Sequence, residues 1–279
     1  MDIISLPAYL GLDETAPVQL FDYQTADEHL KTRINLKANV FSFLQEGTKE
    51  VLTNHDPIHI NDSAFLIIKS GHCLMTEKLS MANQHYRSVL LFFSDDILAS
   101  FIRKHGLNST KASASKSVEV GIYDQYINSF VQGLLDLKLL SPLLQQKLLR
   151  VKLEEILLYL VETRGEEVIR FLLSNTDDYT QNLIKVVENN KLNRLTVKEL
   201  AFLSNTSVST FKREFERHFH TSPMKWFRDK RLEHSAFLLR QSRRPSDIFH
   251  EVGYENVSNF TQAFKTKFGL TPKQYQIQS

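Results

Sequence analysis

Two sets of polar side chains near the C-terminus have the types and spacing that read DNA base edges. The first set comprises Ser209, Thr210, Lys212, Arg213 and Arg217. The second comprises Ser258, Asn259, Thr261, Gln262 and Lys265, with Lys267 beside them. Arginine and lysine donate hydrogen bonds to guanine O6 and N7, whereas asparagine and glutamine pair with adenine. Residues near the start of such a helix reach the bases, and flanking residues contact phosphate.

Two phenylalanine stripes, 49 residues apart, must position these side chains. The stripes are Phe211, Phe215 and Phe219, and then Phe260, Phe264 and Phe268. Residues at i, i+4 and i+8 form one apolar face of a helix. A turn that contains proline follows each stripe, at Ser222-Pro223 and at Thr271-Pro272. The pattern predicts a duplicated unit with an apolar inner face and a polar outer face.

Each copy has the layout of a helix-turn-helix. In the first copy, residues 195–219, we expect Thr196 to cap a short helix and Ser207 to cap a second one after a turn at Asn205-Thr206. Ala201 would let the two helices cross closely, because a small side chain leaves room for the partner helix.

The second copy, residues 245–268, follows the same plan. We expect Ser246 to cap its first helix, Gly253 to make the turn and Asn256 to cap the second helix. Phe249 stands where the first copy has alanine, so its ring should push the helices apart or turn outward.

Residues 224–242 predict one long helix between the copies, which begins at Pro223 and ends before Pro245. A rigid helix in this place would fix the separation of the two units.

The charge is distributed unevenly along the chain. The 279 residues carry a net charge of +2, but residues 182–279 hold 17 Lys and Arg against 9 Asp and Glu, a net charge of +8. Residues 1–181 hold 17 against 23, a net charge of −6. A basic module attached to an acidic body favours binding of a polyanion by the module. A solvated basic surface without a partner is the alternative, and the two matched copies favour DNA over it.

The N-terminal half reads as short strands followed by helices. Runs of β-branched and aromatic residues occur at 18–23, 40–44, 49–53, 58–60, 64–69 and 85–93. Their close spacing favours a sandwich or a small barrel. A helix should begin after Ser94 and stop near Gly106, and residues 111–117 read as a polar loop.

Residues 122–164 are rich in leucine at helical spacing, and Ser141-Pro142 divides them into two helices. The leucines exceed what one narrow stripe needs, so the pair either fills the core or keeps a face for a second chain. Thr176-Asp177-Asp178 should cap a further helix that runs to about Asn190, and we place the domain boundary between Leu173 and Asn182.

Composition and termini indicate a cytoplasmic protein. Cys73 is the only cysteine, so no disulfide forms within the chain and a reducing compartment fits. We expect neither a secretory signal nor a membrane span, because the start has no basic segment before an apolar core and no stretch of about 18 apolar residues occurs.

The C-terminal third resembles the AraC/XylS family of bacterial transcription regulators. Arg231-Leu232 with Ala236 and Leu238-Leu239 resembles the linker motif of that family. Val252-Gly253-Tyr254, Phe268-Gly269 and Thr271-Pro272 resemble its second signature. Two positions depart from the pattern: Phe249, where the family usually has alanine, and His220, where it usually has glycine.

The resemblance implies roles for residues of this chain. Ser209, Lys212 and Arg213 would read bases in one major groove, and Ser258, Asn259 and Gln262 in the next, about 34 Å away. The second set has no basic side chain, so we expect weaker or more shape-dependent readout there. The resemblance also implies an activator rather than a repressor, with RNA polymerase as a partner, and a homodimer formed through residues 122–164.

The predicted fold class is therefore α+β. Residues 1–175 would form a regulatory domain, with a small cupin-like β-barrel at about 18–93 and helices at about 94–173. Residues 176–279 would form an all-α domain with two helix-turn-helix units joined by a long helix.

Three functions remain open for the N-terminal half. A small-molecule effector inside the barrel is the first, with Lys69, His59 and Lys37 as possible polar anchors, and a docked protein partner is the second. A metal-dependent cupin enzyme is the remote third, because His55 and His59 lack the remaining ligands. We expect no enzyme activity, no metal and no cofactor, since the chain shows neither a nucleophile elbow nor a glycine-rich phosphate loop.

Overall fold

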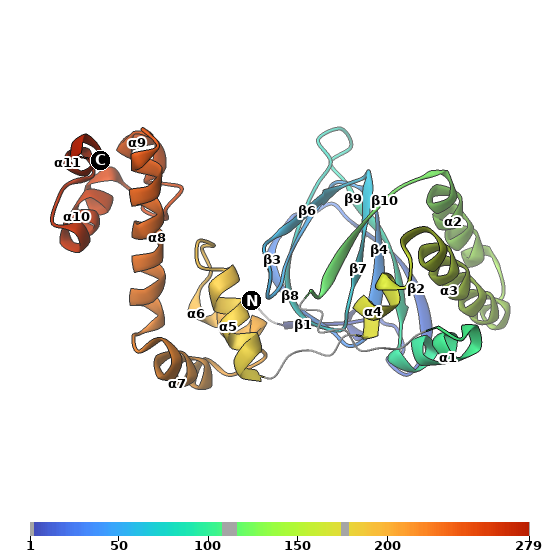
Figure 1. Ribbon diagram of the computed structural model, residues 1–279. Helices are drawn as coiled ribbons and strands as arrows, with labels where there is room; N and C mark the ends of the chain where they lie inside the picture. Colours follow the sequence, from blue (N-terminus) through green and yellow to red (C-terminus); the bar gives the residue numbers. More distant parts are fainter. Residues whose placement is uncertain (1–2, 108–115, 174–178, 279) are drawn as a thin grey trace. The chain divides into compact units, whose positions relative to one another are not determined.

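The chain folds into two compact units, Met1–Asp178 and Tyr179–Ser279. The computed structural model describes residues 3–107, 116–173 and 179–278 (Figure 1). The first unit combines strands with helices, and the described part of the second is helical. Within the described residues, no helix has both the length and the hydropathy that crossing a bilayer requires.

The first unit contains two five-stranded sheets, in the orders β1-β3-β8-β5-β6 and β10-β7-β4-β9-β2. All pairs are antiparallel except β1 with β3. The strands are β1 Ile3–Leu6, β2 Val18–Thr25, β3 His29–Leu36, β4 Asn39–Glu46, β5 Thr48–Leu52, β6 Ile58–Asn61, β7 Ala64–Ile68, β8 Gly71–Lys78, β9 Tyr86–Phe93 and β10 Val118–Ile122.

All six predicted strand segments are present, but the described strands form two sheets and no closed barrel. The prediction of a small cupin-like barrel is therefore wrong for the described residues, and the two sheets form the sandwich that was the alternative. Four strands were missed, namely β1, β3, β8 and β10. Two of these, β1 and β10, lie outside the range of 18–93 that was expected to hold the strands, and β10 falls where only helices were expected.

The sheet that contains β4, β7 and β9 is buried on both faces. Phe41, Phe65 and Leu91 belong to a core shared with the helices of this unit. Their neighbours Val40 and Leu66 belong to a second core, between the two sheets. Because successive side chains of a strand point to opposite faces, a strand covered on both sides reads as a continuous apolar run.

Helices cover the outer face of this sheet (Figure 1). They are α1 Asp95–His105, α2 Gln125–Asp136, the 3₁₀ turn η2 Leu137–Leu139, α3 Pro142–Arg164 and α4 Glu167–Leu173. The predicted start and stop of the first helix are confirmed, with Ser94 as N-cap and Gly106 as C-cap. The predicted break at Ser141-Pro142 is also confirmed, because Ser141 is the N-cap of α3.

Some apolar residues of the leucine-rich helices α2 and α3 are buried, and others are exposed. Leu134, Leu153 and Leu160 are buried against the sheet. On α3, by contrast, Leu144, Val151 and Leu158 are 43%, 59% and 41% exposed, and they recur every seven residues. Leu139 and Leu140, just before α3, and Leu143 in its first turn are exposed as well. We call these six residues the α3 stripe.

The second unit contains seven helices in its described residues. They are α5 Tyr179–Asn189, α6 Val197–Leu203, α7 Val208–Phe219, α8 Pro223–Arg240, α9 Pro245–Ile248, α10 Val257–Phe268 and α11 Pro272–Gln278. The predicted cap of α5 at 176–178 lies outside the described residues. The sequence reasoning missed α11, which follows the second stripe.

The two phenylalanine stripes are built alike. Phe211, Phe215, Phe260 and Phe264 are fully buried, and Phe215 and Phe264 each lie 4.5 Å by ring centroid from the last ring of their stripe. An aromatic ring from the following helix meets each middle ring edge to face. Trp226 of α8 meets Phe215 at 5.9 Å, and Tyr275 of α11 meets Phe264 at 5.3 Å. The duplication therefore extends into the helix that follows each stripe.

Candidate nucleic-acid interface

Side-chain caps fix the start of three of the four short helices in the two copies. Thr196 and Glu199 form a reciprocal capping box at α6. The Ser207 hydroxyl accepts from the Thr210 amide at 3.2 Å, and the Asn256 amide oxygen accepts from the Asn259 amide at 2.8 Å. These three predicted caps are confirmed. Each satisfies backbone donors that the first turn leaves without a partner.

The predicted cap of the second copy's first helix is wrong. Arg244, and not Ser246, is the N-cap of α9, and it makes no side-chain cap bond. Pro245 occupies the first helical position, where its missing N–H has no consequence. The Ser246 hydroxyl lies inside the turn and donates to Asp247 instead, at 2.9 Å.

The Phe249 ring turns partly outward, which is one of the two outcomes expected for it. It is half-buried and lies 3.8 Å by centroid from the ring of His250. The helix α9 ends just before it, at Ile248, after four residues, whereas α6 of the first copy has seven. The first helix of the second copy is thus a single turn.

The residue after each stripe adopts a left-handed backbone conformation. His220 has φ = 51° and Gly269 has φ = 77°. Both cap the preceding helix through their own N–H, which donates to the carbonyl of Glu216 or of Lys265. Glycine adopts this conformation without strain, while a residue with a Cβ does not. His220, which stands where the family usually has glycine, therefore keeps the left-handed backbone conformation at an energetic cost.

The first polar set lies on the outer face of α7. Ser209, Lys212, Arg213 and Arg217 are exposed, and Thr210 is half-buried. Sequence reasoning missed the carboxylate beside the two arginines: Glu214 lies 3.3 Å from the Arg213 Nε and 2.7 Å from an Arg217 terminal nitrogen. This carboxylate orients both guanidinium groups, and it would compete with a phosphate or a base for them.

The second polar set is placed in a similar way on α10. Ser258, Asn259, Gln262 and Lys265 are exposed, and Thr261 is half-buried. The companion residue Lys267 is engaged elsewhere, because its ammonium group donates to the Asp229 carbonyl at 3.0 Å and to the Glu233 carboxylate at 3.0 Å. It connects α10 to α8.

A groove between α8 and α10 contains basic residues that the sequence reasoning did not select. Lys225 and Arg228 of α8 line it together with Asn259 and Gln262 of α10. The i, i+3 spacing of the two basic residues places them on one face of α8. That spacing was the only signal in the sequence.

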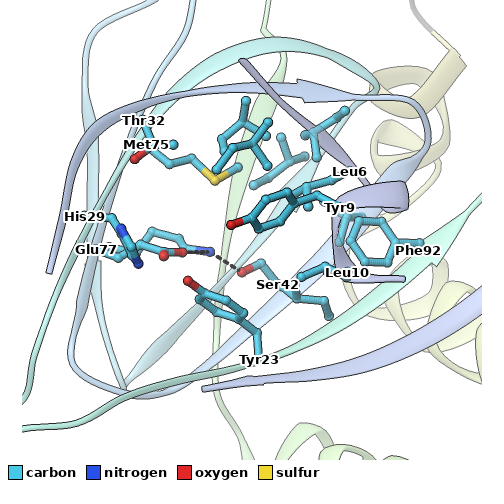
Figure 2. A pocket seen from close by; sticks show the side chains of 17 residues that line it. Leu6, Tyr9, Leu10, Tyr23, His29, Thr32, Ser42, Met75, Glu77 and Phe92 are labelled. Carbon is cyan, nitrogen blue, oxygen red and sulfur yellow. Dashed lines mark hydrogen bonds and ion pairs between the residues drawn. The ribbon is translucent and has the colours of Figure 1, made fainter. Parts of the chain in front are cut away.

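A second candidate site is a cavity inside the first unit, between its two sheets (Figure 2). Its empty space is about 680 Å³, counted to include the open mouth. Most of the wall is apolar. The first ten residues contribute Ile4, Leu6, Tyr9 and Leu10 to it.

Polar groups gather at one end of this cavity. Lys49 and Glu77 are cross-strand neighbours on β5 and β8, and the ammonium nitrogen lies 3.4 Å from the carboxylate. The same ammonium group donates to the Ser42 hydroxyl at 3.0 Å. Figure 2 shows the hydroxyl of Tyr23 facing this group. Burial, and then the negative charge of Glu77, raise the pKa of Tyr23, so that the phenol stays protonated.

None of the anchors suggested from the sequence lines this cavity. His59 is largely exposed and pairs with Glu50 at 3.1 Å, and Lys37 is exposed. The Lys69 ammonium group lies 6.0 Å from the centroid of the Phe171 ring. Within the described residues, no group of three or more His, Cys, Asp or Glu could hold a metal ion.

Two protein families match separate parts of the chain. Residues 200–278 match a family described as a helix-turn-helix domain. Residues 39–171 match a family described as the ExsA N-terminal regulatory domain. The two matches fall in the two structural units.

Two similar regulators match most of the chain and about half of it, respectively. ExsA, a transcriptional regulator of Pseudomonas aeruginosa, is 23% identical over 246 residues, which cover 86% of either protein. VirF, a virulence regulon transcriptional activator of Yersinia enterocolitica, is 28% identical over 132 residues, and the chain spans about half of its length. Among solved structures, ToxT of Vibrio cholerae has a TM-score of 0.42 and 14% identity, with 94% of this chain and 98% of ToxT covered.

Proposed function

We propose that α7 and α10 read two successive major grooves and that the first unit controls this binding. The chain belongs to the AraC/XylS family of DNA-binding transcription regulators. The relatives are transcription regulators and not enzymes, and this chain is a regulator likewise. The observation that supports the proposal most is the repeated geometry: two capped helices, each with a buried phenylalanine stripe and an exposed polar face.

The residues in the first two turns of each helix read the bases. On α7 these are Ser209, Lys212 and Arg213, and on α10 they are Ser258, Asn259 and Gln262. Flanking residues hold phosphates. These are Thr210, Arg217, Thr261 and Lys265.

A mobility-shift titration over several salt concentrations tests these roles. Arg213→Ala should weaken specific binding by about 1–3 kcal/mol and relax the preference at one base pair. Lys265→Ala should weaken binding to every sequence alike and reduce the salt slope by about 0.9. Arg103→Ala, at an exposed arginine of α1 in the first unit, serves as the charge-matched control and should change neither quantity. An unchanged affinity and preference in Arg213→Ala would show that α7 is misplaced on the DNA.

The regulator would act in the bacterial cytoplasm, where the chromosome lies. Activation, with RNA polymerase as the partner, is proposed from the family and from relatives such as VirF, which is a transcriptional activator. Mapping of bound sites across the genome, combined with transcript levels in a deletion strain, tests the sign of control.

The cavity of the first unit is proposed as the effector site, and its charges select the ligand. Lys49 is already paired with Glu77, so the polar end carries no net charge. A carboxylate placed there would meet the Glu77 carboxylate as well as the ammonium group. An uncharged amphipathic molecule, with an apolar body and a head that both donates and accepts, suits the site better.

Two probes of equal chain length separate these chemistries. Melting of the first unit is monitored by circular dichroism. 1-Decanol should raise the melting temperature more than decanoate does. Tyr23→Phe removes one hydroxyl at the polar end and should reduce the effect of decanol. A shift with decanoate alone would contradict the assignment.

The α3 stripe is proposed as a homodimer contact. Three apolar residues at seven-residue spacing suit a helix-to-helix seam, and a helix face of this kind is unusual on a monomer. A protein partner docked on the same surface is the second candidate, and it would leave the isolated chain monomeric in sedimentation.

A further inference from the structure

Arg231, in the middle of α8, is half-buried and has no carboxylate partner among the described residues. Its Nε is buried and has no hydrogen-bond partner among the described residues. No ion pair to this guanidinium group occurs in the described part of the chain either. The neighbouring Arg228 and Lys230, by contrast, pair with Asp229 and Glu233.

A second guanidinium group and a phenol lie near the first. A Cβ added to Gly253 would be 3.2 Å from the Arg231 Nε and 3.6 Å from the Arg194 Nε, so both side chains approach this glycine. Tyr254 follows directly, and its hydroxyl is also buried without a partner. Three donor groups from the loop before α6, from α8 and from the turn after α9 therefore meet around Gly253.

This arrangement destabilises the unit when nothing is bound. Burial lowers the pKa of Arg231; Tyr254 acts to raise it, and the charge of Arg194 acts to lower it. A buried polar group without a partner costs about 1–3 kcal/mol, and the site has two such groups. An anion in contact with both guanidinium groups and the phenol would remove the cost.

We propose that Arg231, with Arg194 and Tyr254, binds one phosphate of the DNA backbone between the two major grooves. The proposal rests on DNA binding by the second unit and adds to it a contact that is separate from both recognition helices. The position supports DNA as the source of the anion. With 18 residues, α8 is about 27 Å long, and Arg231 is its ninth residue. The contact would therefore lie midway along the helix that joins the two copies.

One phosphate contact has a defined effect on the salt dependence. The logarithm of the association constant falls by about 0.9 per contact for each tenfold rise in salt. Arg231→Gln should therefore reduce the slope by about 0.9 and weaken binding about 8-fold at 0.1 M salt, with the difference vanishing towards 1 M. A random-sequence duplex of about 40 base pairs suffices, because phosphate contacts carry no sequence preference.

Three further variants separate the contact from general effects. Lys230→Gln removes the same charge from the adjacent residue, whose ammonium group is held by Glu233, and it should change the slope much less. Arg231→Lys keeps the charge and should keep the slope. Tyr254→Phe should weaken binding about 2- to 10-fold at every salt concentration with the slope unchanged, because it removes a neutral hydrogen bond. Equal slopes for Arg231→Gln and wild type would overturn the proposal.

Two controls distinguish the remaining outcomes. Melting of the full chain, followed by Trp226 fluorescence, shows whether each variant is folded. If Arg231→Gln does not fold, the result for Tyr254→Phe decides. Sodium phosphate at constant ionic strength tests for a free anion: a rise in melting temperature that Arg231→Gln abolishes, together with an unchanged DNA slope, would refute DNA as the source. A wild-type chain without affinity for the duplex would instead refute the proposed function itself, and this site with it.

Discussion

Replacing Lys49 with methionine should destabilise the first unit strongly. The lysine is 3% exposed, and its ammonium group lies 3.4 Å from a Glu77 carboxylate that is 11% exposed. Methionine has a similar length and no charge, so the substitution leaves a buried carboxylate without its partner. Removing one member of a buried ion pair costs about 3–5 kcal/mol, because the remaining charge stays out of water.

The only cysteine and the only tryptophan report on the two units separately. Cys73 lies on β8, four residues before Glu77, and burial raises the pKa of its thiol to about 12. A thiol reagent at pH 8 therefore reacts only when the first unit opens. Trp226 lies in the second unit. At about 1.36 kcal/mol per factor of ten, Lys49→Met should accelerate labelling of Cys73 about 150- to 5000-fold.

The double variant Lys49→Met/Glu77→Leu is the decisive control. It removes both charges and fills the space with apolar atoms, so labelling should return towards the wild-type rate or fall below it. Urea unfolding followed by Trp226 fluorescence should be the same in all three proteins. Labelling of Lys49→Met at the wild-type rate, or no recovery in the double variant, would refute the reasoning about this ion pair.

Three further predictions concern other parts of the chain. Val151→Glu places a charge in the α3 stripe, and sedimentation should then show a monomer where the wild type is a dimer; Lys78→Glu, at an exposed lysine of β8, is the control. His220→Gly relieves a left-handed residue with φ = 51° and should stabilise the second unit by about 0.5–1 kcal/mol in urea unfolding followed by Trp226. Asp22 is buried, which by itself would raise its pKa, but hydrogen bonds from Arg87 and Lys138 hold that pKa at about 2. The ionised Asp22 therefore stabilises the fold above about pH 4, and this stabilisation is lost as the pH falls to 2. Asp22→Asn should be less stable than wild type by about 1–2 kcal/mol at pH 7 and equally stable near pH 2.

The second unit was predictable from local signals. A stripe every four residues, a capping residue and a proline mark each helix, and none of them depends on distant parts of the chain. The errors arose where one local rule competed with another. Ser246 is a good cap by type, but Pro245 had already taken the first helical position. The aromatic contact between Tyr275 and Phe264 shows that the repeat continues into α11.

The first unit was harder to predict because its polar interior breaks the strand pattern. The middle of β8 is buried throughout, yet it contains Thr76 and Glu77, which a sequence pattern assigns to the surface. On β5, which was predicted as a strand at 49–53, Lys49 is also buried although its type suggests the surface. Glu77 and Lys49 line the cavity, so a side chain of the site itself helped to conceal β8. Pairing between β5 and β8 brings them together, and composition does not reveal that register.

The sheet with both faces covered separates the cavity from the helices that carry the α3 stripe by only one backbone thickness. On β7, Ile68 lines the cavity, while the adjacent Ile67 packs among the helices that carry the α3 stripe. A molecule that pushes on one side chain tilts the peptide that it shares with the next. Occupancy of the interior and pairing between subunits would thus be linked by the pleat of a strand, and neither a hinge nor a moving loop is needed to transmit the signal.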